Sequence, residues 1–347
     1  MKRALSFLVL VAVIVSAFSC LTVSAASADD ILGAWFGRYD GDSSGENVER
    51  YMNMTIDECD KEGNFSGTAY VTTVEGQGHD KEWVTYEFKG KYEFETGKFY
   101  MKGVKELESD SSSNWRLIPF DGLVSGDNIS GLADDSDYKK FSFARVSEWA
   151  KDEITQADSL GLIPEIIRNE DLSKNISRAE FAAVAVQLYE KLTDTEVSVS
   201  GAKNFIDISG HPAETEIKQA SAIDITVGVS DVEFEPNSGI TREQLATMLC
   251  RTVKKYRFAD WTYETDSDYY LDSEGVKKFA DDDLISDYAK PSVYYMVKMG
   301  IINGIDDNRF APRNTTKEEE ANGYASATRE QALAMSLRIY RLSDIWN

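Results

Sequence analysis

The sequence predicts a multidomain α+β protein, in which an antiparallel β barrel or sandwich is followed by a mainly α-helical region. Two observations predict this fold class. Between the N-terminal leader and about residue 146, apolar residues recur at every second position, as in half-buried strands. After residue 146 they recur at the spacing of amphipathic helices, within a unit that is repeated along the chain.

The N-terminus has the three parts of a secretory signal peptide. Lys2 and Arg3 supply the positive charge, the apolar run 5–18 follows, and Ala26-Ser27-Ala28 offers small residues for signal peptidase. The apolar run is shorter than a membrane-spanning helix requires, and no later stretch is apolar enough, so the mature chain is expected to be secreted without a membrane span. Cys20 leaves a lipoprotein anchor as the alternative.

Acidic residues outnumber basic ones, with 60 Asp and Glu against 37 Lys and Arg and a net charge of −23. Such a chain is repelled by nucleic acid, which is therefore not an expected partner. Cys59 and Cys250 remain after cleavage, so one disulfide is open, but no disulfide scaffold is expected. His79 and His211 are the only histidines, so a His-based triad or zinc site is hard to build. We expect no metal and no cofactor.

The region 29–145 is predicted to be the β domain. In the segment 84–94, Val84, Tyr86 and Phe88 alternate with polar residues. The other candidate strands are 51–56, 65–74, 98–104, 115–120 and 140–146, and hairpin-turn sequences stand at 61–64, 95–98 and 125–128. About seven or eight short strands with such turns are typical of an antiparallel barrel or sandwich. The opening segment 33–37 contains Gly-x-Trp and resembles the first strand of lipocalin- and avidin-like barrels.

A helix start marks each copy of the repeated unit. Ser177 precedes a helix with Glu180 three residues later, which is a capping box. Related starts follow at Thr241-Arg242-Glu243-Gln244 and Thr328-Arg329-Glu330-Gln331.

The third copy is the most complete. In order, it contains Phe279-Ala280-Asp281, Tyr288-Ala289, Gly300-Ile301-Ile302-Asn303-Gly304, Phe310-Ala311-Pro312 and the Thr328 helix start. The second copy has Phe205-Ile206-Asp207, Phe234-Glu235-Pro236 and the Thr241 start, and the first has Trp149-Ala150, Leu160-Gly161-Leu162-Ile163 and the Ser177 start.

This order of motifs resembles the S-layer homology (SLH) family, whose repeats run F-x-D, W-A, G-I-I-x-G, F-x-P and I-T-R-A-E. The resemblance covers about residues 146–342. It implies a three-pronged pseudo-trimer around a central helical bundle, and binding of secondary cell-wall polysaccharide, often pyruvylated, in grooves between the prongs. It also implies a location at the cell wall or cell surface of a bacterium. The expected parts are a signal peptide (1–28), the β domain (29–145) and three SLH repeats (146–200, 201–257, and 258–347 with insertions).

The resemblance implies a set of glycan-binding residues. A pyruvate ketal presents a carboxylate, which the planar fork of an arginine can bind through two hydrogen bonds, and a helix N-terminus also favours an anion. The carboxylate is expected to bind Arg178, Arg242 or Arg329. The sugar hydroxyls are expected to bind Asp207, Asp281 and Asn303, and the sugar faces are expected to stack on Trp149 and Tyr288. Gly304 would let the backbone approach the ligand closely. In the alternative interpretation, the arginines pair with acidic neighbours and brace the bundle, the aspartates cap turns, and Trp149 lies in the core.

The copies differ, so the grooves are expected to be unequal. The second copy has Asp224 where the third has Gly300, and the first has Glu165 where a carboxylate ligand would be repelled. The groove that uses Arg329 is the favoured one. The insertions 260–274 and 317–325 are expected to be solvated loops, with a calcium site as the alternative for the acidic one.

The β domain is then the part that the repeats display. We expect no enzyme and no catalytic residues, because acidic runs such as Asp40 and Asp57 to Asp60 are usually solvated. A module that binds a small ligand or glycan, or a passive spacer, is expected instead. The alternative is a wall-anchored glycan hydrolase with paired carboxylates in the β domain.

Overall fold

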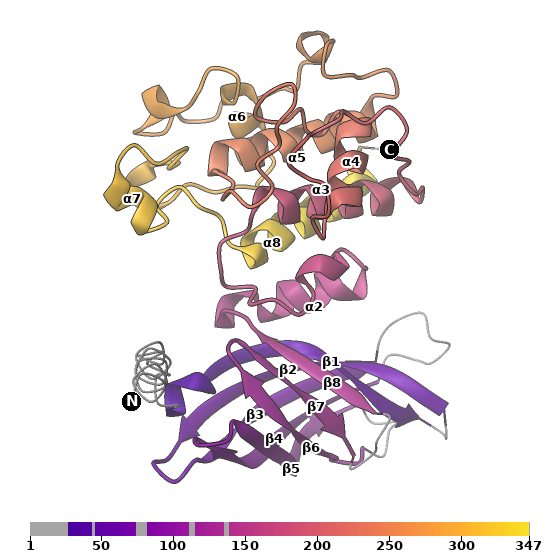
Figure 1. The fold of residues 1–347 in the computed structure, drawn as a ribbon, viewed down its shortest axis with the longest axis vertical. Helices are drawn as coiled ribbons and strands as arrows, with labels where there is room; N and C mark the ends of the chain where they lie inside the picture. The colour runs from indigo at the N-terminus through magenta and orange to yellow at the C-terminus, as the bar shows by residue number, and fades with distance from the viewer. Residues whose placement is uncertain (1–26, 44–45, 74–81, 111–114, 135–138, 347) are drawn as a thin grey trace, which may run out of the picture.

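The computed structural model describes residues 27–43, 46–73, 82–110, 115–134 and 139–346. The predicted signal peptide, Cys20 and His79 lie outside these residues, apart from the last two residues of the leader. Figure 1 shows a β barrel joined to a helical region, with the helix α2 between the barrel and the other helices.

The N-terminal domain is a closed antiparallel barrel of eight strands, which decides between barrel and sandwich. Each strand pairs with the next, and β1 closes the barrel by pairing with β8. The strands are β1 (Gly33–Ser43), β2 (Glu46–Cys59), β3 (Asn64–Thr73), β4 (Trp83–Glu93), β5 (Lys98–Ser109), β6 (Pro119–Ser125), β7 (Asn128–Ala133) and β8 (Lys140–Arg145).

Two strands depart from the predictions. The candidate strand 115–120 overlaps only the beginning of β6, and β7 was not predicted at all. The sequence of β7, Asn-Ile-Ser-Gly-Leu-Ala, carries few large apolar residues, so its alternation is weak. Its pairing with β6 and β8 supplies the backbone hydrogen bonds that fix it as a strand.

Aromatic side chains fill the interior of the barrel. Phe65 and Phe99 stack with their ring centroids 4.9 Å apart, and Phe120 packs edge-on against Tyr39 at 5.0 Å. Trp35 is fully buried and donates a hydrogen bond from Nε1 to the carbonyl of Ile31. The alternation in the sequence therefore gives a packed core.

The helical region contains α2 (Lys151–Ser159), α3 (Arg178–Thr193), α4 (Glu214–Ala222), α5 (Arg242–Arg257), α6 (Lys290–Lys298), α7 (Lys317–Ala321) and α8 (Arg329–Leu342). The three long helices α3, α5 and α8 contact one another and form the central bundle. Each begins at a capping box on Ser177, Thr241 or Thr328, as the sequence predicts.

Backbone hydrogen bonds join the three copies in a ring. The N–H of Arg178 donates to the carbonyl of Ser238, that of Arg242 to Ala325, and that of Arg329 to Lys174. The start of each long helix is thus held by the chain segment that precedes the next long helix. This arrangement closes a pseudo-threefold unit, in which the start of each long helix meets a neighbouring copy.

The acidic insertion 260–274 is only in part the solvated loop that the sequence predicts, because most of its residues are exposed or partly exposed but two are buried. Trp261 is fully buried and Leu271 is 6% exposed. Asp266 accepts hydrogen bonds from Trp261 Nε1 (2.9 Å) and from Lys254 Nζ on α5 (2.7 Å). These contacts fold the insertion onto α5. The second insertion also contains structure, because α7 lies in it.

The barrel and the first copy share a core. Phe36 and Tyr51 point outward from the barrel and belong to the same buried cluster as the helices. The N–H of Val146 donates to the carbonyl of Ala34, and the N–H of Leu172 donates to that of Arg145. The two regions therefore meet through packed side chains as well as through the connecting chain.

Candidate functional site

A cavity of about 330 Å³ lies between the copies, next to the start of α3. Within the described part of the chain, its lining includes two arginines and neither Asp nor Glu, although the chain as a whole is strongly acidic. The lining residues are Arg178, Thr226, Val227, Gly228, Val229, Gln244, Thr247, Met248, Arg251, Tyr263 and Tyr288. We call this cavity the Arg178 groove.

Arg178 is held in place by backbone and ring contacts. It is the first residue of α3, after the Ser177 cap, and only 6% of it is exposed. Its Nε donates to the carbonyl of Phe234 at 2.9 Å, and its guanidinium lies 5.0 Å from the centroid of that ring. Burial lowers the pKa of Arg178, and the negative charge of Glu235 opposes this shift. The arginine nevertheless stays charged, because its ordinary pKa is far above neutral pH. Among the described residues, no carboxylate forms an ion pair with it.

Arg251 is the second cation of the groove, and the sequence analysis did not select it. It lies on α5, where its Nη1 donates to the carbonyl of Ile225 at 3.4 Å and its guanidinium lies 4.8 Å from the Tyr263 ring centroid. Burial lowers its pKa as well. Within the described part of the chain it has no acidic ion-pair partner. Its position on the same face of α5 as Gln244 was a signal that could have found it.

The three predicted arginines have different surroundings. Arg329 forms an ion pair with Glu180, with Nη2 2.7 Å from Oε1, and both side chains are 13% exposed. Arg242 donates from Nε to Phe310 and from Nη2 to Asn303, in both cases to the backbone carbonyl. Arg329 therefore has the bracing contact of the alternative interpretation. The geometry favours Arg178 over Arg329 as the residue that receives an anion.

One position in the first turn of each helix explains this difference. Glu180 of α3 is matched by Gln244 in α5 and by Gln331 in α8, and all three close the capping boxes. The ring of copies places Arg329 against Glu180, and it places Arg178 in one cavity with Gln244. The neutral amide of Gln244 leaves Arg178 without the carboxylate that neutralises Arg329.

A second position further along each helix sharpens the contrast. The residue that corresponds to Arg251 is Gln187 in α3 and Arg338 in α8. Arg338 forms an ion pair with Glu153 at 3.2 Å. Of the three grooves, the one at Arg178 alone combines two arginines that have no acidic ion-pair partner among the described residues.

The two predicted aspartates hold turns in the structure. Asp207 accepts from the N–H groups of Phe234 and Glu235, the latter at 2.7 Å. Asp281 is 6% exposed and accepts from the N–H groups of the equivalent turn, Phe310 and Ala311, at 2.8 Å each. These contacts shape the loops beside the grooves.

The predicted aromatic residues are exposed. Tyr288 is 57% exposed and lines the Arg178 groove, and Trp149 is 52% exposed, so Trp149 does not lie in the core. Asn303 uses its carbonyl to accept from Arg242. A Cβ at Gly304 would lie 2.7 Å from Phe279, so local packing already requires glycine there.

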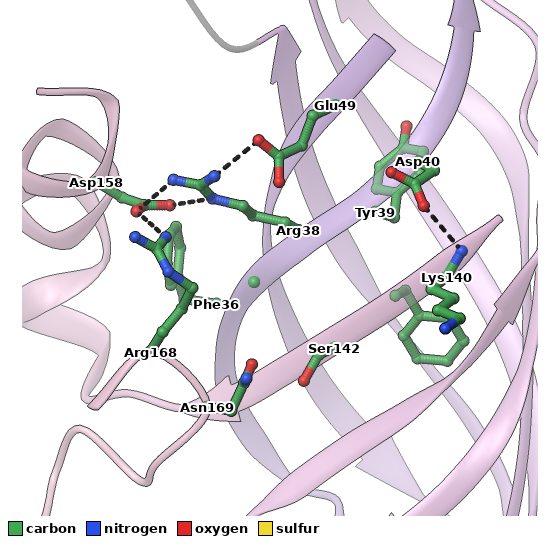
Figure 2. A pocket seen from close by; sticks show the side chains of 12 residues that line it. Phe36, Arg38, Tyr39, Asp40, Glu49, Lys140, Ser142, Asp158, Arg168 and Asn169 are labelled. Carbon is green, nitrogen blue, oxygen red and sulfur yellow. Dashed lines mark hydrogen bonds and ion pairs between the residues drawn. The ribbon is translucent and has the colours of Figure 1, made fainter. Parts of the chain in front are cut away.

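Another cavity, of about 310 Å³, lies at the junction of the barrel and α2. Figure 2 shows Asp158 between Arg38 and Arg168, with Glu49 on the far side of Arg38. Asp158 is fully buried, and both arginines reach its Oδ1 at 2.6 Å, while Arg38 Nη1 lies 2.7 Å from Glu49. These arginines are neutralised by the protein's own carboxylates. The cluster therefore acts as a brace between β1 and the first copy.

Comparison with known proteins assigns part of the lining of the Arg178 groove to a known family, whereas Arg178 and Arg251 lie outside the matched residues. A model of the S-layer homology domain matches residues 204–246 and 278–321. The chain is 32% identical over 175 residues to an exoglucanase, XynX, of Acetivibrio thermocellus, which is 50% of this chain and 15% of that protein. It is 30% identical over 194 residues to an amylopullulanase of Thermoanaerobacterium thermosulfurigenes, covering 54% of this chain and 10% of that protein.

A third relative has a name that describes its role. The chain is 26% identical over 159 residues to a cellulosome-anchoring protein of Acetivibrio thermocellus, which is 46% of this chain and 35% of that protein. The chain thus spans 35% or less of the length of these relatives. In the described residues, no helix has the length and apolar character of a membrane span.

Proposed function

Residues 204–246 and 278–321 are S-layer homology repeats, and from this premise we propose that the chain is an exported protein held non-covalently to a bacterial cell-wall polysaccharide. The proposal places an acidic sugar residue of that polysaccharide in the Arg178 groove. The barrel is the part displayed at the cell surface, where it binds a small ligand or glycan.

The observation that carries the proposal is the pair of arginines, Arg178 and Arg251, that have no acidic ion-pair partner among the described residues of a chain of net charge −23. Distant negative charge is screened over about 8–10 Å in physiological salt, so the local pair controls binding of an anion. A carboxylate in a partly desolvated cavity gains charge-assisted hydrogen bonds from a guanidinium. A pyruvylated sugar supplies such a carboxylate on a neutral ring.

The remaining lining suits the sugar ring. Gln244 and Thr247 offer an amide and a hydroxyl to sugar hydroxyls, and Tyr288 presents an exposed ring for stacking. The guanidinium of Arg251 lies over the Tyr263 ring. This combination supports a carbohydrate ligand over a free inorganic anion.

For the barrel we propose a role without catalysis. Two of the suspected carboxylates bind backbone groups: Asp40 accepts from the N–H of Lys140, and Asp60 accepts from the N–H groups of Glu62 and Asn64. They hold hairpins. An anchored hydrolase remains the alternative, since two relatives have the names of glycan-degrading enzymes, yet this chain covers only 15% and 10% of them.

The test is co-sedimentation of the full chain with cell walls from the encoding bacterium. Arg251→Gln installs the residue that α3 has at the corresponding position, Gln187, so the fold should tolerate it. We expect binding to fall by about tenfold or more, because a charge-assisted contact is lost. Arg116→Ala, which removes an exposed arginine of the barrel domain, is the control and should bind like the wild type.

Walls stripped of their polysaccharide provide the second arm of this experiment. The wild-type chain should stay in solution with stripped walls and sediment with intact ones. A chain that stays in solution with intact walls, or an Arg251→Gln variant that binds them normally, contradicts the proposal.

A further inference from the structure

A smaller cavity of about 140 Å³ adjoins the Arg178 groove on the other side of Tyr288. Tyr288 lines both cavities. The smaller one is walled by the insertion, through Asp266, Ser267 and Tyr270, and by Lys254 of α5. We call it the insertion cavity.

One face of α5 runs through both cavities. Thr247 and Arg251 line the Arg178 groove, and Cys250 and Lys254 line the insertion cavity. These positions follow the i, i+3, i+4, i+7 spacing of a single helix face. From Thr247 to Lys254 the helix rises about 10 Å, so the two cavities lie one after the other along the same face of α5.

The wall of the insertion cavity is fixed before any ligand binds. Trp261 is fully buried, and its Nε1 and the Nζ of Lys254 both donate to Oδ1 of Asp266. Lys254 itself is only 8% exposed. The polar groups that face the cavity are therefore held in position.

The charge of the insertion cavity differs from that of the Arg178 groove. Its cation, Lys254, is paired with Asp266 at 2.7 Å, so the two charges balance. Among the described residues, Oδ2 of Asp266 accepts no hydrogen bond, and the side chain is 42% exposed. Tyr270 is 68% exposed beside it. A free acceptor, a hydroxyl from Ser267 and an exposed ring suit a neutral sugar, whereas an anion would meet no unpaired cation.

We infer that the insertion cavity is a subsite for an uncharged sugar residue, adjacent in the polymer to the acidic residue held by Arg178 and Arg251. The insertion thereby makes the chain prefer a polysaccharide over a single acidic sugar. This inference rests on the proposed function, and its test distinguishes failure of the subsite from failure of the proposed function.

The test measures binding of the full chain to two probes by titration calorimetry. One probe is the wall polysaccharide of the encoding bacterium, and the other is a methyl glycoside of a pyruvylated hexose. Tyr270→Ala should weaken binding of the polysaccharide by about tenfold, the loss of one exposed aromatic contact, and should leave binding of the monosaccharide unchanged. Tyr270→Phe, which keeps the ring, should bind both probes like the wild type.

Tyr100→Ala is the matched control, since Tyr100 is an exposed tyrosine (42%) on the barrel strand β5. If Tyr270→Ala binds the polysaccharide within twofold of the wild type while Arg251→Gln does not, the subsite is wrong and the proposed function stands. If Tyr270→Ala weakens both probes equally, the insertion cavity has no separate sugar and the inference is likewise wrong. Normal binding by Arg251→Gln overturns the proposed function itself.

Discussion

Glu180 and Gln244 occupy the same position of their helices, and this one difference separates a neutralised arginine from an available one. Both side chains accept from the backbone N–H of their own cap residue, Ser177 or Thr241. The carboxylate of Glu180 also binds Arg329, whereas an amide in that place offers no negative charge. Glu180 thus caps its own helix and also neutralises an arginine of another copy.

Gln244→Glu should therefore convert the Arg178 groove into a copy of the Arg329 site. The new carboxylate keeps the capping box and pairs with Arg178, so we expect a normal fold and a loss of wall binding of about tenfold or more. Co-sedimentation with cell walls measures the loss, and circular dichroism checks the fold. Gln331→Glu, the same exchange in the neighbouring copy, is the control, and equal binding by both variants would refute the assignment of the groove.

The sequence could name the three arginines and could not rank them. Arg329 and Glu180 are 149 residues apart, and nothing local shows that they meet. From the sequence, Arg329 is the favoured ligand because the copy that contains it matches the family motifs most completely. The structure favours Arg178 because pairing across the ring of copies, rather than motif quality, decides which guanidinium is free of a carboxylate.

At the scale of elements, the long helices were predictable because their capping boxes are local signals. The strands of the barrel were mostly predictable from alternation. The folded insertion was not, since Trp261 is buried by α5 and by Asp266, partners that the composition of an acidic, Tyr-rich segment does not reveal. The same packing, which the sequence did not reveal, places three tyrosines of the insertion at the cavities: Tyr263, Tyr269 and Tyr270.

The turn of the second copy should depend on pH through Asp207. Burial opposes ionisation of Asp207, but hydrogen bonds from the N–H groups of Phe234 and Glu235 outweigh it, and its pKa is lowered from 3.8. A lowered pKa in the folded state means that the stabilisation is present above the unfolded-state pKa, near 3.9, and is lost as pH falls through the folded value. The difference in melting temperature between the wild type and Asp207→Asn should thus be largest near neutral pH and shrink below about pH 4.

Thermal unfolding monitored by circular dichroism at several pH values checks this prediction. Asp287→Asn removes an equally negative but fully exposed side chain and serves as the control. A difference for Asp207→Asn that stays constant between pH 7 and pH 3 would show that the turn does not depend on the ionised carboxylate.

For the whole molecule, the junction of barrel and repeats could not be read from the pattern alone. Trp35 and Phe36 are neighbours on β1, so one faces the barrel interior and the other faces out. An apolar residue on each face signals a strand covered on both sides, but not what covers it. The structure supplies the answer in α2 and its buried Asp158, which tie the displayed domain to the anchor.

This tie should make the barrel and the first copy unfold together. Asp158→Ala leaves Arg38 and Arg168 without the fully buried carboxylate that both contact, so the free energy of unfolding should fall by about 3–5 kcal/mol. Glu148→Ala, which removes an exposed carboxylate from its pair with the partly buried Lys151, should cost at most about 1 kcal/mol. Urea unfolding followed by hydrogen exchange of the barrel strands and by helical circular dichroism gives both values. If the two signals separate in the wild type, or if Asp158→Ala unfolds like Glu148→Ala, the barrel is tethered to the repeats without being braced by them.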